Sequence, residues 1–79
     1  MEGTVIKEKI KDVLVSILGH DNFEMYDELT AADVDGWDSL SHMMILTKIE
    51  ESFNIKFKLR DLNKLKNMGT LVAVIQSKI

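Results

Sequence analysis

Apolar residues that recur every three or four positions constrain the fold of this chain most strongly. In residues 4–18 they form one stripe, which consists of Ile6, Ile10, Val13, Leu14 and Ile17. This spacing is the period of an α-helix with one buried face, and Gly19 follows it as a typical helix stop. No segment alternates between apolar and polar residues as a half-buried strand does, and the sequence has no proline. The pattern predicts an all-α fold.

A second helix is predicted over residues 38–53, and its two faces differ. The face suited to the core comprises His42, Ile45, Leu46, Ile49 and Phe53. The opposite face comprises Leu40, Met44, Thr47, Lys48 and Glu51. Leu40 and Met44 lie one turn apart where contact with water is expected, and a clustered apolar pair at the surface is typical of a docking site.

The remaining segments complete a small bundle. Residues 20–37 form a long acidic loop, in which Thr30 and Asp33 are suited to cap a short turn. A short helix is predicted near residues 59–65. We therefore expect one domain over residues 1–79, a bundle of three to four helices with a long loop between the first two.

The last helix is predicted to start at Gly69-Thr70. Threonine is a common N-cap residue, so Thr70 is expected to cap this helix. Its apolar stripe consists of Leu71, Val74, Ile75 and Ile79.

Charge is distributed unevenly along the chain. Residues 21–51 hold nine acidic side chains and one lysine, whereas residues 52–79 hold six basic side chains and one acid. The acidic field repels nucleic-acid phosphates and attracts basic protein surfaces, so no nucleic-acid partner is expected. Acids that only solvate a loop are the alternative interpretation.

Size and composition exclude other classes. A chain of 79 residues buries a thin core and leaves no room for a large catalytic pocket. It has no cysteine, and no apolar run approaches the length of a membrane span. The first nineteen residues mix acids and lysines with apolar residues, unlike a signal peptide. We expect a monomer in the cytoplasm, without a transmembrane segment.

Ser39 stands out at the start of the second predicted helix. Asp38 is an N-cap residue by type and position, which makes Ser39 the first helical residue. Its hydroxyl is then expected to face solvent at the positive end of the helix dipole, near free amide hydrogens, where an attached anion is favoured. A helix-start serine with no further role is the alternative.

Neither a hydrolase nor a metal site fits these residues well. His42 follows Ser39 by three positions, as a catalytic base could, but the Gly-x-Ser-x-Gly elbow of a nucleophilic serine is absent. His42 also falls on the inward face, where we expect it to be partly buried and hydrogen-bonded. His20 is expected at the surface. The stretch Asp-Val-Asp-Gly-Trp-Asp suggests a calcium loop, but the first and twelfth positions of such a loop are Ala31 and His42.

Residues Asp38-Ser39-Leu40 resemble the Asp-Ser-Leu motif of the acyl carrier proteins and their peptidyl and aminoacyl carrier relatives. The end of the second helix, "KIEESFNI", is similar to the acidic helix end with its phenylalanine in that family. The order of the predicted elements is also similar over essentially the whole chain. The resemblance implies a bundle of the acyl-carrier-protein type and a carrier protein, not an enzyme.

In that family the motif serine receives a 4′-phosphopantetheine arm from coenzyme A, and the thiol of the arm carries an acyl or aminoacyl group. The resemblance therefore implies attachment at Ser39, with Asp38 as the motif aspartate. The implied partners are a phosphopantetheinyl transferase, a loading ligase or synthase and downstream transferases. The implied partner-binding residues are Leu40, Met44, Thr47, Glu50 and Glu51.

Three positions depart from the fatty-acid type of carrier. Trp37 stands where an alanine is usual, and Ser41 and Met44 occupy positions that are commonly acidic. Together with the start at Met1 and the absence of a linker, these departures favour a free-standing carrier of a specialised pathway. Trp37 is also expected to anchor the loop on the core. An unmodified helical adaptor that binds a basic partner through Leu40, Met44 and the acidic face remains the alternative.

Overall fold

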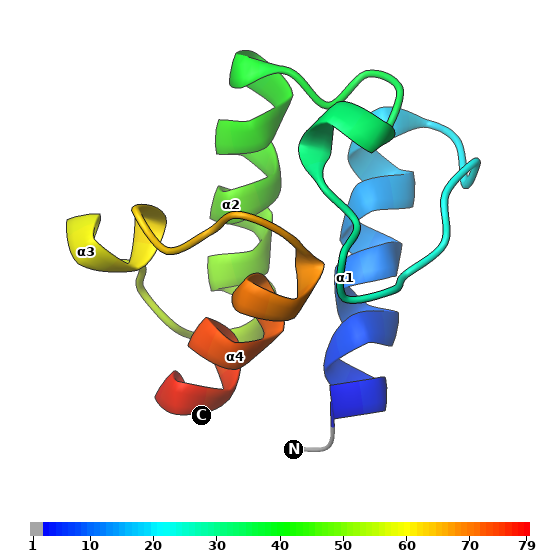
Figure 1. Cartoon of the computed structure of the whole chain (residues 1–79). Coiled ribbons are helices and arrows are strands. Elements are labelled where there is room, and N and C mark those ends of the chain that lie inside the picture. Colours follow the sequence, from blue (N-terminus) through cyan, green and yellow to red (C-terminus); the bar gives the residue numbers. More distant parts are fainter. Residues whose placement is uncertain (1–2) are drawn as a thin grey trace.

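The computed structural model describes residues 3–79 and is built entirely from helices and loops (Figure 1). The elements, in chain order, are α1 (Gly3–Leu18), the 3-10 helix η1 (Ala31–Asp33), α2 (Ser39–Phe53), α3 (Leu59–Leu62) and α4 (Met68–Lys78). Residues 3–79 contain no strand. The predicted all-α bundle with a long loop between its first two helices is therefore confirmed.

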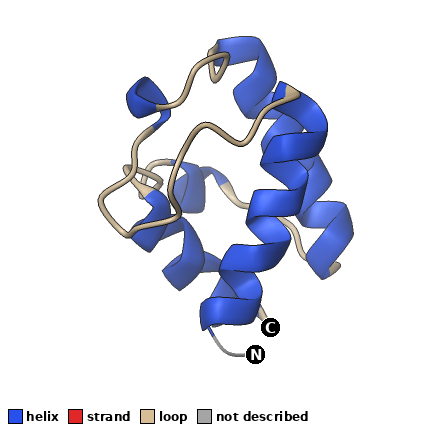
Figure 2. Ribbon diagram, turned by 90° about the vertical axis from the view of Figure 1, so that its right-hand side faces the viewer, coloured by secondary structure: helices blue, strands red, loops and turns tan. Residues whose placement is uncertain are grey.

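The two long helices α1 and α2 lie side by side and run in opposite directions (Figure 1). The helix α4 packs against α1 and ends near the start of that helix, as both views show (Figures 1 and 2). The side chains that are almost completely enclosed between these helices are Ile6, Ile10, Leu14, Ile45, Ile49, Met68 and Ile75. The loop between α1 and α2 turns back along α1 and adds Leu29 and Val34 to this core.

Both long helices end where the sequence predicts. Gly19 follows α1 with a φ of 78°, and Asn54 follows α2 with a φ of 54°. The left-handed region favours glycine and tolerates asparagine, which explains why these two residue types stop the helices. The short turn predicted at Thr30 and Asp33 is also present, since the Asp33 carboxylate accepts hydrogen bonds from the Thr30 amide and hydroxyl.

The start of α4 differs from the prediction. The N-cap residue is Asn67, whose side chain accepts a hydrogen bond from the Thr70 amide at 2.9 Å. Thr70 lies three residues inside the cap, and its hydroxyl accepts the Asn67 amide at 3.0 Å. The prediction of Thr70 as N-cap was wrong because Asn67, which is also a favoured N-cap type, takes that position three residues earlier.

Two smaller predictions also need correction. The helix α3 is a single turn, Leu59–Leu62, and is shorter than the expected range of 59–65. Ile79 follows the last residue of α4 and is half exposed, so it does not extend the buried stripe of that helix.

Asp61 of α3 forms an ion pair with the end of α4. It is the buried charged residue among residues 3–79, and its Oδ2 lies 2.8 Å from the Lys78 Nζ. The same oxygen accepts the Lys58 amide at 2.8 Å. The hydrogen bond from Lys78, and then that from the Lys58 amide, hold the pKa of Asp61 below its ordinary value. The carboxylate is therefore more stable in the folded chain than in the unfolded one.

We predict that Asp61→Asn lowers the midpoint of urea denaturation at pH 7. Because the folded-state pKa of Asp61 is depressed, its contribution to stability is complete above the unfolded pKa of about 3.9 and is lost as pH falls through the folded value. The difference between the wild type and the variant should therefore shrink between about pH 5 and pH 3. Circular dichroism at a series of pH values measures it.

Asp27→Asn is the matched control for this prediction. Asp27 pairs with the Lys7 Nζ at 2.7 Å, but its side chain is largely exposed, and exposed ion pairs contribute little. This substitution should leave the midpoint almost unchanged. A difference between wild type and Asp61→Asn that is constant from pH 7 to pH 3 would contradict the assigned role of the carboxylate.

Candidate functional site

The start of α2 is closed by the side chain of Asp38. Its Oδ1 accepts hydrogen bonds from the Leu40 amide at 3.0 Å and the Ser41 amide at 2.9 Å. The hydrogen bonds from Ser41 are the main cause that lowers the pKa of Asp38. Asp38 is thus the ionised N-cap residue of α2, in the geometry that its position in the sequence predicts.

Ser41 completes this cap, a role that the sequence analysis missed. Its Oγ accepts the Asp38 amide at 2.8 Å and lies 2.7 Å from the Gly36 carbonyl oxygen, to which it donates. The signal in the sequence is the spacing of a capping box, in which the third residue after the N-cap bonds back to the N-cap amide. Ser41, which stands at a position that is commonly acidic in fatty-acid carriers, therefore has a structural function of its own.

Ser39 is the first residue of α2, and its side chain is exposed. None of the cap hydrogen bonds involves its hydroxyl, because Asp38 and Ser41 make all of them. The hydroxyl therefore lies at the positive end of the helix without a structural task. One expectation is corrected: the Leu40 and Ser41 amides are bound to Asp38, so they are not free for an anion on Ser39.

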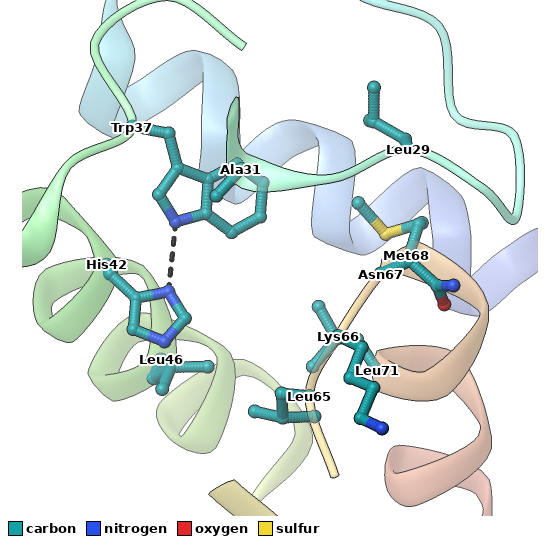
Figure 3. Close-up of a pocket in the computed structure, with 10 residues that line it drawn as sticks. All are labelled: Leu29, Ala31, Trp37, His42, Leu46, Leu65, Lys66, Asn67, Met68 and Leu71. Atoms are coloured by element: carbon teal, nitrogen blue, oxygen red, sulfur yellow. Dashed lines mark hydrogen bonds between the residues drawn. The ribbon is translucent and has the colours of Figure 1, made fainter. Parts of the chain in front are cut away.

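Trp37 and His42 form a second contact beside this cap. The Trp37 Nε1 donates to the His42 Nδ1 at 3.0 Å, and the two rings stack with their centroids 6.1 Å apart (Figure 3). Both side chains are partly buried. The predictions of a hydrogen-bonded, partly buried His42 and of Trp37 as an anchor of the loop are confirmed. Because His42 Nδ1 accepts this hydrogen bond, the ring proton of the neutral imidazole lies on Nε2.

His20 anchors the loop from the other side. Its Nε2 lies 2.7 Å from the Asp35 carbonyl oxygen, and its Nδ1 accepts the Asn22 amide at 3.0 Å. The ring packs edge-on against Phe23 and is only partly buried, so His20 has a structural role that its expected place at the surface did not indicate. Asp35 is thereby held directly before Gly36, whose φ of 84° turns the chain toward Trp37 and the cap.

The outer face of α2 carries the predicted apolar pair. The exposed fractions of Leu40 and Met44 are 75% and 51%, and Met43, which the sequence analysis did not select, is 58% exposed. Thr47 and Glu51 are also exposed. These residues and Ile17 of α1 line one shallow hollow between α1 and α2.

Glu50 differs from its neighbours on this face. It is only partly exposed, and its Oε2 accepts the Phe57 amide at 2.8 Å. The carboxylate therefore closes the connection between α2 and α3. Sequence spacing placed Glu50 at the edge of the outer face but gave no sign of this contact with a residue seven positions away.

Two structural absences bear on the site. Among residues 3–79, no three histidine or acidic side chains gather in a way that could hold a metal ion. No helix within the same range is long and apolar enough to cross a membrane.

With this geometry in view, comparison with known proteins decides the family. A family model described as "Phosphopantetheine attachment site" matches residues 8–75. The chain belongs to this family of acyl carrier proteins. Its members are carriers and not enzymes, and their prosthetic group is covalently attached 4′-phosphopantetheine.

Individual relatives agree with this assignment. An acyl carrier protein of Streptococcus pneumoniae is 36% identical over 69 residues, which cover 87% of this chain and 89% of that protein. One from Thermotoga maritima is 30% identical over 74 residues, or 94% and 91% of the two chains. The solution structure of a holo acyl carrier protein from Geobacter metallireducens matches with a TM-score of 0.84 and 34% identity, over 92% of this chain and 84% of that one.

We predict that the two serines at the start of this carrier's α2 differ in their effect on stability. Ser41→Ala removes half of the capping box and should lower the free energy of unfolding by about 1 kcal/mol. Ser39→Ala removes a hydroxyl outside the cap and should change it by less than about 0.5 kcal/mol. Chemical denaturation of both variants measures the difference, and equal losses would contradict this division of roles.

Proposed function

We propose that this protein carries an acyl or aminoacyl group on a 4′-phosphopantetheine arm attached to Ser39. The observation that carries the proposal is the exposed Ser39 hydroxyl at the start of α2, left out of a cap that Asp38 and Ser41 complete. When bound, the arm supplies a thiol that holds the cargo as a thioester. The tether raises the effective concentration of the cargo at each partner enzyme.

The residues around Ser39 explain why this serine needs a separate transferase. His42 is bound through Nδ1 to Trp37, and residues 3–79 contain no hydrogen bond between His42 and Ser39. No base is therefore placed to deprotonate Ser39, as a nucleophilic serine requires. A phosphopantetheinyl transferase is proposed to supply this base, while Asp38 holds the first turn of α2 in place.

The proposed partner surface is the outer face of α2, which comprises Leu40, Met43, Met44, Thr47, Glu50 and Glu51. Its support is the exposed apolar cluster next to Ser39. Glu50 is proposed to act there mainly by fixing the loop before α3. The proposed partners are the transferase, a loading ligase or synthase, and downstream transferases.

We further propose that the protein acts in a specialised biosynthetic pathway. Support for this lies in three positions, where Trp37 forms a hydrogen bond, Ser41 closes the cap and Met44 adds apolar surface in place of charge. A partner suited to this face would be less basic and more apolar than one suited to an acidic helix. We propose that residues 1–79 form one carrier domain, of which Met1 and Glu2 lie outside the described residues. We also propose that it acts as a monomer in the cytoplasm, where coenzyme A supplies the arm.

We predict that incubation with coenzyme A, magnesium and a broad-specificity phosphopantetheinyl transferase adds one phosphopantetheine unit to the wild type. The same treatment should leave Ser39→Ala unchanged, because that variant lacks the acceptor hydroxyl. Intact-mass spectrometry measures both. Circular dichroism of Ser39→Ala shows that the missing modification does not result from unfolding.

The rival interpretations predict different results in this experiment or in an assay of ester turnover. An unmodified adaptor gains no mass with either of two unrelated transferases. A hydrolase that uses Ser39 and His42 turns over simple esters and loses that activity in His42→Ala, whereas a carrier shows no turnover.

A further prediction concerns docking. Leu40→Ala and Met44→Ala should each raise the KM of the transferase for this protein by up to about tenfold, because buried apolar contacts dominate such interfaces. Val5→Ala removes an exposed apolar side chain near the start of α1, away from α2, and should have no effect. If the KM rises with salt but neither α2 substitution changes it, docking is governed by electrostatic attraction and not by Leu40 and Met44.

A further inference from the structure

A small cavity lies beside the proposed attachment site. Its walls include Trp37, His42 and Leu46 on one side and Leu65, Met68 and Leu71 on the other (Figure 3). His42 follows Ser39 by three residues, which corresponds to about 4.5 Å along the axis of α2 and to neighbouring positions on its surface. The Trp37–His42 wall is therefore the part of the cavity that lies next to Ser39.

The lining suits an aliphatic group. Most of the residues around the cavity are apolar, and Leu46, Met68 and Leu71 belong to the buried core. The Trp37 indole N–H and the His42 Nδ1 are already hydrogen-bonded to each other, so neither needs a ligand. A hydrocarbon tail would thus enter without leaving these polar atoms unsatisfied.

The cavity is small. Its volume is about 50 Å³, whereas a cavity of about 150 Å³ accommodates benzene with its six carbons. In proportion, the cavity has room for roughly two carbon atoms beyond the group that reaches its mouth. A longer tail would have to displace one of the walls.

Trp37 is a wall that resists displacement. Its amide donates to the Val34 carbonyl oxygen at 3.2 Å, and its indole N–H is bound to His42. Val34 is part of the core, so the hydrogen bond to its carbonyl fixes the main chain of Trp37, while the bond to His42 fixes the ring. If the indole swung outward, it would break the hydrogen bond to His42 and lose the stacking between the rings.

We propose that Trp37 and His42 restrict the cargo that this carrier shelters to short acyl groups, of about two to four carbons. The inference rests on the proposed attachment at Ser39. In this role Trp37 limits the length of the tail, and His42 is a positioning residue that holds the indole in place. Longer acyl groups remain outside the cavity, exposed to solvent.

The test uses protein loaded from acetyl-, propionyl-, butyryl- and octanoyl-coenzyme A by a broad-specificity transferase. Trp37 is the only tryptophan in the sequence, so its fluorescence reports directly on this cavity. Propionyl and butyryl groups should shift its emission from that of the unacylated phosphopantetheine form, and the octanoyl group should not. The rate at which hydroxylamine cleaves the thioester gives a second readout, which should fall at least about threefold for a tail that is sheltered most of the time.

The variants separate a length limit from a merely structural role. Trp37→Ala should protect the octanoyl thioester, and so should His42→Leu, which removes the hydrogen-bond acceptor and frees the indole. His42→Asn keeps an acceptor near the position of Nδ1 and should behave as the wild type. Tyr26→Ala removes an exposed aromatic side chain outside the cavity and is the matched control.

The outcomes are decisive. If no coenzyme A derivative adds mass, the proposed attachment fails before the cavity is tested. If loading succeeds but octanoyl is protected as well as propionyl in the wild type, or no acyl group changes the Trp37 emission, the length limit is overturned and the attachment stands. If Trp37→Ala does not fold, His42→Leu alone decides, and an unchanged preference for short tails in that variant overturns the role of the pair.

Discussion

The cap at the start of α2 is the interaction on which the site depends. A helix begins with amide hydrogens that have no partner inside the helix. Here Asp38 accepts those of Leu40 and Ser41, and Ser41 accepts that of Asp38. Ser41 also bonds the Gly36 carbonyl, so the cap fixes the end of the long loop as well as the first turn of the helix. Ser39 is held at a defined place by its neighbours, while its own hydroxyl is left for chemistry.

The loop before the cap is ordered by a few side chains. His20 holds the Asp35 carbonyl, Trp37 holds His42, and Leu29 and Val34 enter the core. These anchors allow a long acidic segment to lie along α1 in a small domain (Figure 1). The basic residues of 56–66 lie instead around α3, on the side of the molecule away from α1 (Figure 1). A basic surface would therefore be attracted to the side of the molecule that carries the acidic loop.

The sequence predicted the helices because their apolar spacing and stop residues are local signals. Ile6, Ile10 and Leu14 specify the buried face of α1, and Asp38 specifies the start of α2, without reference to distant parts of the chain. The predictions that failed depend on competition or on tertiary contacts. Asn67 and Thr70 are both common capping residues, and in the structure α4 starts after the first of them, with Met68 buried in the core. The contacts of Glu50 with Phe57 and of His20 with Asp35 join residues whose proximity no local pattern encodes.

The central claim is that Asp38 and Ser41 maintain the cap and that Ser39 alone accepts the arm. Trypsin releases residues 12–48 as one peptide, because no lysine or arginine lies between Lys11 and Lys48. Fragmentation of this peptide after treatment with transferase and coenzyme A locates the added phosphopantetheine. The account predicts that C-terminal fragments that begin at Ser39 carry the added mass and that those that begin at Leu40 do not. Added mass on fragments that begin at Leu40 would place the arm on Ser41 or beyond and would contradict the account.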